Sequence, residues 1–409
     1  MVPREARMSG RPSPLVVDRL IDDRRTRIIV CCGSGGVGKT TIAAAIGLRA
    51  AERGRHVVVL TVDPAKRLAQ SMGLSSLDNT PRLVHGFRAD GPAHPRHAAH
   101  GHDPAAADQP GSMHAMMLDM KRTFDEIVEA HADPDRAAQI LANPFYQSLS
   151  SSFAGTQEYM AMEKLGQLRR ADEWDHIVVD TPPSRSALDF LDAPQRLGRF
   201  LDGRLLRLLV APAKLGGRTG MKVLNISLGM VTSVVTRIIG SQLLRDVQTF
   251  VSAMDTMFGG FRERAEYTYR LLRAPGTAFL VIAAPEPDAL REASYFVERL
   301  ERDQMPLAGL LLNRVHRSPA ARLSAARSLA AAETLAGLDG RAAGESAEIG
   351  VAALRLHAER MRQSASERRL AERFTAAHPL VPVAQIPAQP DDVHDLDGLR
   401  EIGRAFTAE

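Results

Sequence analysis

The chain has 409 residues, of which 44% are hydrophobic and 24% charged, a composition typical of soluble globular proteins with one large domain or two interleaved ones. Its 52 basic and 48 acidic residues leave a net charge of +4, which is too small for this length to indicate a nucleic-acid partner. The N-terminus lacks a long apolar segment, so we expect no secretory signal and interpret residues 1–26 as a flexible leader.

Six short apolar runs, rich in Val, Ile and Leu and without polar alternation, recur along the chain. This pattern is typical of strands that are buried on both faces of a parallel sheet. Helical patterns separate them, so the sequence predicts an α/β fold with a doubly wound, mostly parallel sheet. The predicted strands cover residues 27–32, 56–63, 175–180, 276–284, 307–315 and 380–387.

The only two cysteines of the chain are adjacent, at Cys31 and Cys32 in the first predicted strand. Neighbouring cysteines cannot build an ordinary disulfide framework, and there is no C-x-x-C pair to hold zinc. Their number and placement also exclude an iron–sulfur protein. We therefore expect reduced thiols and a cytoplasmic location.

The segment "GSGGVGKT", residues 33–40, follows the first predicted strand and precedes a predicted helix. It fits the G-x-x-x-x-G-K-[ST] pattern of a P-loop, in which backbone N–H groups and a helix N-terminus converge on phosphate oxygens. We therefore expect an ATP site in a P-loop NTPase sheet. The residues expected to bind the nucleotide here are Gly35, Gly36, Val37, Gly38, Lys39, Thr40 and Thr41.

Side chains around this loop have the chemistry of ATP hydrolysis. Lys39 can reach the β- and γ-phosphates, and the Thr40 hydroxyl can ligate Mg²⁺. Asp63 and Asp180 each stand at the end of a predicted strand, where an open α/β sheet collects its ligands. We expect Asp180 to hold Mg²⁺ through water and Asp63 to orient the attacking water near the metal, although either carboxylate could be a solvated loop side chain. The predicted catalytic residues are Lys39 and Asp63, and the predicted metal ligands are Thr40, Asp63 and Asp180.

Two long helix-rich stretches, residues 112–171 and 193–273, interrupt the alternation and lack strand-like runs. We expect them to form a helical subdomain inserted into the sheet domain. Residues 221–244 are strongly apolar, but Lys222 and Arg237 would be costly at a bilayer centre, so no membrane span is expected. This segment either packs as plain core or offers an apolar groove to a partner helix.

Residues 90–111 are low in apolar bulk and dense in Ala, Pro, His and Asp, so we expect a disordered loop. Its histidines either bind a metal ion or coordinate nothing specific. They are His94, His97, His100 and His102.

Three motifs resemble the ArsA-type ATPases, the P-loop family that includes the arsenite-pump ATPase and the ATPase that targets tail-anchored membrane proteins. "DPA" at residues 63–65 resembles the switch I of this family, and "DTPPS" at residues 180–184 resembles its switch II. "LLNRV" at residues 311–315 resembles the strand end whose asparagine recognises adenine, which nominates Asn313 as a further nucleotide-binding residue.

The resemblance runs from Arg27 almost to the C-terminus. "AGTQE" at residues 154–158 is similar to the P-G-x-D-E helix start of the family, with Gly155 and Glu158 matching and Gln157 in place of the aspartate. The C-terminal part is similar to the paired ArsA-like ATPases of actinobacteria. The resemblance implies a dimeric ATP-driven switch.

The chain departs from the family at Ser34, since the family P-loop reads G-K-G-G-V-G-K-T and its first lysine reaches the partner subunit's nucleotide. It also lacks the zinc-binding C-x-x-C of the targeting ATPase and the cysteine trio that binds arsenite in the pump ATPase. Arsenite transport and a zinc-clamped homodimer are therefore poorly supported. We expect a heterodimer with a paralogous subunit that carries the lysine, although self-association stays open.

Two other readings compete with this switch. One is an ATP-binding regulatory subunit that hydrolyses weakly, which Ser34 keeps open, and the other is a partitioning-type ATPase on DNA or membrane. We favour an ATPase with a possible apolar-helix client, no nucleic-acid partner and only peripheral membrane contact. The expected divisions are the leader 1–26, the nucleotide-binding core in three parts (27–89, 172–192 and 274–409), the loop 90–111, and the helical subdomain in two parts (112–171 and 193–273).

Overall fold

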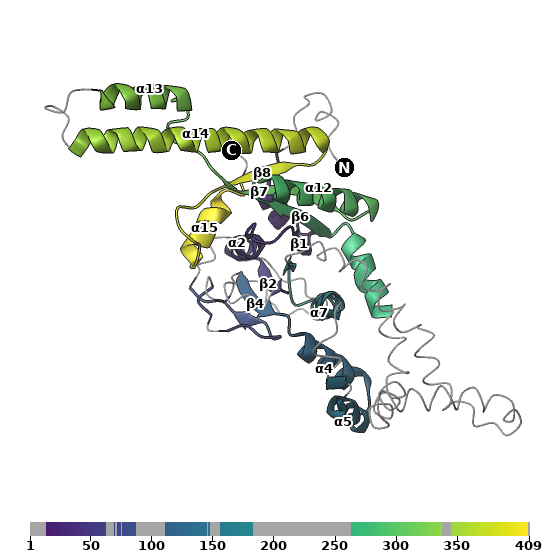
Figure 1. Cartoon of the computed structure of the whole chain (residues 1–409). Helices are drawn as coiled ribbons and strands as arrows, with labels where there is room; N and C mark the ends of the chain where they lie inside the picture. The colour runs from purple at the N-terminus through teal and green to yellow at the C-terminus, as the bar shows by residue number, and fades with distance from the viewer. Residues whose placement is uncertain are drawn as a thin grey trace, which may run out of the picture.

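The computed structural model describes residues 14–62, 69, 72–74, 76–86, 111–144, 146–147, 156–182, 263–337 and 345–407 (Figure 1). Asp63, the histidine-rich segment 90–110 and most of the second helix-rich stretch lie outside these residues.

An eight-stranded sheet forms the body of the described structure, with the strand order β3-β4-β2-β5-β1-β6-β7-β8. All neighbouring strands are parallel except β3 and β4. The result confirms the predicted doubly wound, mostly parallel α/β fold and all six predicted strands. These are β1 (Ile28–Cys32), β2 (His56–Thr61), β5 (His176–Asp180), β6 (Thr277–Ala283), β7 (Leu307–Val315) and β8 (Val383–Pro387).

The sequence analysis did not predict two of the described strands. β3 (Arg82–Leu83) pairs with β4 (Ser112–Met117), and β4 runs parallel to β2. The expectation that residues 112–171 lack strands was therefore wrong at their start. The sequence of β4, SMHAMM, contains no Val, Ile or aromatic ring of Phe, Tyr or Trp, so its strand state follows from pairing with β2 rather than from its own propensity.

Helices cover both faces of the sheet. α2 leads from β1 to β2 and α12 leads from β6 to β7, in opposite directions along the strand order. Because crossovers between parallel strands are right-handed, these two helices lie on opposite faces. The described helices are α1 (Val17–Asp22), α2 (Lys39–Glu52), α4 (Met120–His131), α5 (Pro134–Ala142), α7 (Thr156–Ala171), α12 (Pro287–Arg302), α13 (Ala325–Ala336), α14 (Glu345–Ala377) and α15 (Leu396–Arg404).

The helices α13 and α14 pack side by side, and part of this hairpin extends beyond the sheet in Figure 1. α14 is 33 residues long and also contacts α12. The chain leaves the sheet at the end of β7, passes through both helices and returns as β8. Glu367 of α14 contacts His316, which directly follows β7, so this part of α14, the base of the α13–α14 hairpin, lies beside the sheet edge at which β7 ends.

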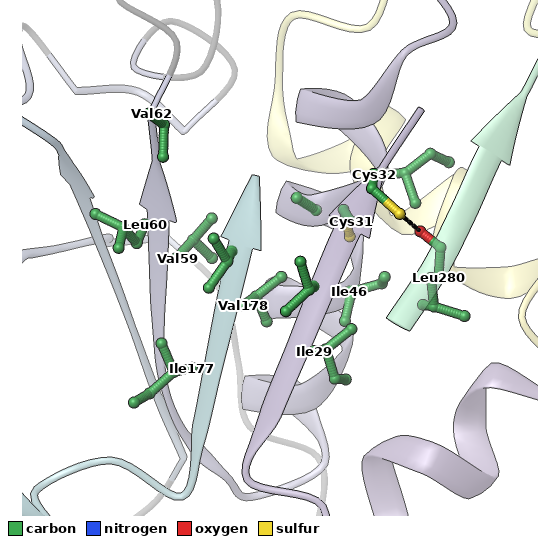
Figure 2. Close-up of a cluster of buried hydrophobic side chains, with 14 of the residues drawn as sticks. Ile29, Cys31, Cys32, Ile46, Val59, Leu60, Val62, Ile177, Val178 and Leu280 are labelled. Atoms are coloured by element: carbon green, nitrogen blue, oxygen red, sulfur yellow. Dashed lines mark hydrogen bonds between the residues drawn. The ribbon is translucent and has the colours of Figure 1, made fainter. Parts of the chain in front are cut away.

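The core is built from the central strands and the inner face of α2. Figure 2 shows Ile29 of β1 and Ile46 of α2 packed beside Val59 and Val178 from the neighbouring strands. Cys31 and Cys32 are free and buried in this core, and the Cys32 thiol donates to the carbonyl oxygen of Leu280 over 3.5 Å. Burial raises the pKa of both thiols, that of Cys32 to about 12, so they act as small core residues.

The described parts of the two helix-rich stretches are helical after β4, namely α4, α5, α7 and residues 263–273. Glu163 of α7 ties two of these helices together, because its buried carboxylate accepts from Arg264 at 3.1 Å. Within the described ranges, no helix combines the length and the hydropathy that a membrane span requires. The division of the chain into a core and an inserted subdomain stays a prediction.

Candidate nucleotide-binding site

The glycine-rich loop, residues 33–38, lies between β1 and α2 at the point of the sheet from which the crossovers leave in opposite directions. Such a switch point is where doubly wound sheets bind their ligands. Gly33 has a φ of 153°, and a Cβ built on it would lie 2.1 Å from the carbonyl oxygen of Ile282 in β6. Only glycine allows this contact, so the loop begins directly against the backbone of β6.

The other end of the loop is held by β7. Gly38, the N-cap of α2, has a left-handed φ of 89°, and a Cβ there would lie 2.5 Å from Nδ2 of Asn313. The buried Asn313 donates from Nδ2 to the carbonyl oxygen of Val37 over 2.8 Å. In this structure the Asn313 amide thus supports the loop backbone, and it also lines the cavity described below.

The loop has the features that bind phosphate groups. The first turn of α2, which the structure describes in full, has no acidic side chain, and Gly38 has no side chain to cap its N–H groups. The N–H groups of a helix N-terminus and the positive end of the helix dipole favour an anion. Lys39 is 6% exposed and donates from Nζ to the Ser34 carbonyl oxygen over 2.8 Å, so its ammonium group lies over this loop.

Two hydroxyl groups meet the carboxylate of Asp180 at the end of β5. Thr40 Oγ1 donates to Asp180 Oδ2 over 2.6 Å, and Thr61 Oγ1 donates to the same oxygen over 2.9 Å. Asp180 is fully buried and lies between Cys31 and Thr61 in the register of the sheet. Carboxylate and hydroxyl oxygens beside a phosphate-binding loop are the hard ligands that Mg²⁺ prefers, so the residues fit a magnesium–nucleotide complex.

The coordination would need phosphate and water oxygens as well. Within the described ranges, no three His, Cys, Asp or Glu side chains gather as a metal site. Mg²⁺ is usually bound by one or two protein oxygens together with substrate phosphates.

A cavity of about 550 Å³ continues from the loop toward β7 and β8. This is within the usual size range of small-ligand pockets. Its lining comes from the N-terminus of α2, the end of β7 and the segment after β8. The lining residues are Gly38, Thr40, Thr41, Asn313, Arg314, His316, the segment 387–394 and Ile402.

The structure brings most of the residues predicted from the sequence to this one sheet edge. Lys39, Thr40, Asp180 and Asn313 surround the loop as described, Thr41 lines the cavity, Val37 is buried, and Gly35 and Gly36 form the exposed tip of the loop. Asp63 lies outside the described residues, and so do Gly155 and the side chains of Gln157 and Glu158. Their predicted roles are therefore untested.

The sequence analysis missed three parts of the site. Thr61 is the last residue of β2, and its hydroxyl at a strand end was the available signal. His316 follows the predicted strand end of β7, and the segment 387–394 follows β8, where the backbone N–H of Ala388 donates to the Val315 carbonyl oxygen over 3.0 Å. Polar residues after predicted parallel strands could have identified both.

Several known proteins are similar to this chain over part of its length. The chain is 26% identical to the ATPase GET3 of Malassezia globosa over 188 residues, which are 46% of this chain and 48% of that protein. It is 23% identical to the ATPase ARSA2 of Chlamydomonas reinhardtii over 319 residues, 74% of this chain and 72% of that protein. It is 26% identical to a putative arsenical pump-driving ATPase of Halobacterium salinarum over 212 residues, 50% of this chain and 29% of that protein.

The chain thus spans about half the length of some curated relatives and about 70% of others. The model of the anion-transporting ATPase family matches residues 26–328, a range that begins just before β1 and contains the glycine-rich loop, Asp180 and Asn313. The match covers well over half of the 409 residues and confirms the resemblance drawn from the motifs. The chain belongs to the anion-transporting ATPase family.

Proposed function

We propose that this chain binds ATP with Mg²⁺ and hydrolyses it as one subunit of a dimeric nucleotide switch. The observation that carries the proposal is the meeting of Lys39, Thr40 and Asp180 at the switch point of the sheet. A phosphate loop, a buried cation and a carboxylate–hydroxyl pair are the parts that phosphoryl transfer requires.

Each residue has a distinct role in this proposal. The loop N–H groups and Lys39 bind the β- and γ-phosphates and offset their charge. Thr40 and Asp180 would hold Mg²⁺, Asp180 through water, and a bound Mg²⁺ would supply positive charge beside the phosphate oxygens. Asp63, directly after β2, orients the water that attacks the γ-phosphate.

Two variants test binding and hydrolysis separately. Lys39→Ala should abolish ATP binding or turnover, whereas Asp63→Asn should keep ATP binding and lower kcat by about 10² or more, because a water-orienting group acts mainly in the transition state. Lys121→Ala, which removes an exposed lysine on α4, is the matched control. Normal ATP affinity and turnover in Lys39→Ala would contradict the proposed function.

The proposal of a second subunit rests on Ser34, which stands where the family has a lysine. In a homodimer neither site would receive the lysine that crosses between subunits in the family arrangement. A paralogue carrying that lysine would complete the site of this chain. If instead both ATP turnover and its stimulation by the paralogue are absent, Ser34 favours the second candidate function, an ATP-binding regulatory subunit.

The client is proposed to be an apolar helix bound by the helical subdomain in an ATP-dependent way. This rests on the resemblance and on the apolar segment 221–244, which lies outside the described residues. Equal capture of an apolar helical peptide with and without ATP, or no capture, would contradict it. Arsenite is a poor client, because Cys31 and Cys32 are buried with raised pKa values and cannot offer thiolates at neutral pH. The same reduced thiols support a cytoplasmic location.

A further inference from the structure

His316 lines the cavity, and a residue of α14 holds its ring from the side of this helix. It follows β7 by one residue and lines the cavity beside the segment 387–394. Its side chain is 25% exposed, so part of the ring is accessible from the cavity. Neither the P-loop motif nor the family motifs described above include this residue.

Glu367 holds His316 at two points. Its Oε1 lies 2.7 Å from Nδ1 of the His316 ring, and its Oε2 accepts the His316 backbone N–H over 2.8 Å. The Glu367 side chain is only 9% exposed, so both contacts are shielded from water. The amide nitrogen of Gln363, one turn earlier on α14, lies 3.0 Å from the same ring nitrogen. Two donors do not bond, so beside an Nδ1 that carries a proton the Gln363 amide turns its oxygen to the ring.

These contacts leave one ring nitrogen for a ligand. An ionised carboxylate only accepts hydrogen bonds, so Nδ1 carries the proton that points to Glu367. In the neutral ring Nε2 is then an acceptor. Because Nδ1 is used on the α14 side, Nε2 is the ring nitrogen that remains for a molecule in the cavity.

The position of His316 in the cavity indicates which part of a bound nucleotide it would contact. Phosphate groups belong at the loop and at the N-terminus of α2, whose Gly38, Thr40 and Thr41 line one part of the cavity. The nucleoside must then occupy the end formed by β7 and the segment after β8. A hydrogen-bond acceptor there matches a nucleoside donor, either a ribose hydroxyl or the exocyclic amino group of the base.

We propose that His316 binds the nucleoside part of the nucleotide through Nε2 and that Glu367 of α14 is the positioning residue for its ring. This assignment rests on the proposed function, since it names a specificity contact of the same site. It also makes the base of the α13–α14 hairpin part of the nucleotide pocket, because one buried carboxylate of α14 holds a cavity residue.

Two substitutions of His316 separate the ligand contact from the contact with α14. The amide of glutamine reaches the position of Nε2, whereas that of asparagine reaches only the position of Nδ1. His316→Asn should therefore weaken ADP and ATP binding by about 3- to 10-fold, the loss expected for one hydrogen bond, while His316→Gln should retain most of the affinity. Pyrophosphate, which lacks a nucleoside, should bind all three proteins alike.

Glu367→Ala should likewise weaken ADP but not pyrophosphate, and Glu367→Gln, which keeps one acceptor oxygen, should lose less. His357→Ala is the control, since His357 of α14 bonds the Leu323 carbonyl oxygen within the hairpin and does not line the cavity. Melting temperatures identify any variant that fails to fold, and if His316→Asn does, the ADP and pyrophosphate affinities of Glu367→Ala, Glu367→Gln and His357→Ala decide the outcome.

The nucleotide analogues identify the donor. If His316→Asn no longer weakens 2′-deoxyATP, the contact is to the ribose, and if it no longer weakens inosine triphosphate, the contact is to the amino group of the base. An equal loss for pyrophosphate and ADP, an unchanged ADP affinity in His316→Asn, or the same loss in His357→Ala would overturn the assignment. A wild-type chain that binds neither ATP nor pyrophosphate would instead overturn the proposed function.

Discussion

The Thr40 hydroxyl donates to the Asp180 carboxylate over 2.6 Å, although 140 residues separate them in the chain. Thr40 lies in the first turn of α2 and Asp180 ends β5, so this contact joins the phosphate-binding loop to the strand that carries the proposed metal ligand. Any change that neutralises Asp180 should therefore affect the metal before it affects the fold.

Asp180→Asn tests this relationship. The carboxamide oxygen can still accept from a threonine hydroxyl, but the group has lost the charge that attracts Mg²⁺. We expect ATP turnover to fall by about 10² or more, and the dependence of ATP affinity on Mg²⁺ concentration to weaken. Titrations of ATP at several Mg²⁺ concentrations measure both, with Asp397→Asn, an exposed change on α15, as the control. An unchanged Mg²⁺ dependence would remove Asp180 from the metal site.

Gly33→Ala tests whether the glycine-rich loop must pack directly against the backbone of β6. The new Cβ would lie 2.1 Å from the Ile282 carbonyl oxygen, and φ at this position disfavours side chains. We expect the free energy of unfolding to fall by about 2 kcal/mol or more and ATP affinity to fall with it. Chemical denaturation of this variant beside Ser34→Ala, which should stay within about 0.5 kcal/mol of wild type, provides the measurement. Equal stability of the two variants would show that the loop can leave β6 at little cost.

The sequence analysis predicted the parts of this protein that a short stretch of sequence identifies by itself. β1, β2, β5 and β6 are continuous apolar runs because helices bury both of their faces, and the P-loop has its own residue pattern. β4 has no such signal, since its six residues become a strand only beside β2.

The rest of the candidate site depends on contacts between distant residues. Thr61 reaches Asp180 across 119 positions, and His316 reaches Glu367 across 51. Nothing near Glu367 in the sequence distinguishes it from the other glutamates of α14, most of which are exposed. Its role exists only because α14 returns to the edge at which β7 ends.

The buried His176, at the opposite end of β5 from Asp180, should make the stability of the protein depend on pH. Burial, followed by the nearby positive charge of Arg55, lowers the pKa of His176 from 6.5 to about 4. Between these values the unfolded chain binds a proton that the folded chain does not, so the free energy of unfolding should fall as the pH falls from about 6.5 to 4. The two pKa values differ by about 2.5 units, so His176 can account for at most about 3 kcal/mol of the free energy of unfolding. None of this stability is lost above pH 7.

Urea unfolding of the wild type and of His176→Gln across this pH range measures the effect. The glutamine amide can still donate to the Ile21 carbonyl oxygen, which His176 contacts at 3.0 Å, but it does not titrate. We expect a flatter profile in the variant. A smaller slope should persist, because burial also lowers the pKa of the neighbouring His114 on β4. Identical profiles would show that His176 is not the group that titrates.

The last prediction concerns Ser34 and the second subunit. Ser34 contacts Lys39 through its backbone carbonyl, which any residue provides. Ser34 is also not one of the described residues that have a positive φ. A lysine side chain therefore fits at this position without strain. Purified alone, the wild-type chain should bind Mg-ATP yet hydrolyse it slowly, and adding a paralogue that carries the lysine should raise the rate.

Ser34→Lys should reproduce this gain without the paralogue, because each subunit of a homodimer would then supply a cation to the other subunit's site. A cation supplied in trans to a phosphoryl-transfer site can raise kcat by about 10³–10⁵, which sets the upper limit. Ser34→Met, similar in length but uncharged, is the control and should stay slow. Since the effect acts across subunits, the rate per subunit should also rise with protein concentration. Lys66 follows the DPA motif at residues 63–65 and is the lysine of this chain that could substitute for the missing one. Fast hydrolysis by the wild type alone, unaffected by Lys66→Ala, would show that no such lysine is needed, and Ser34 would then be a neutral replacement.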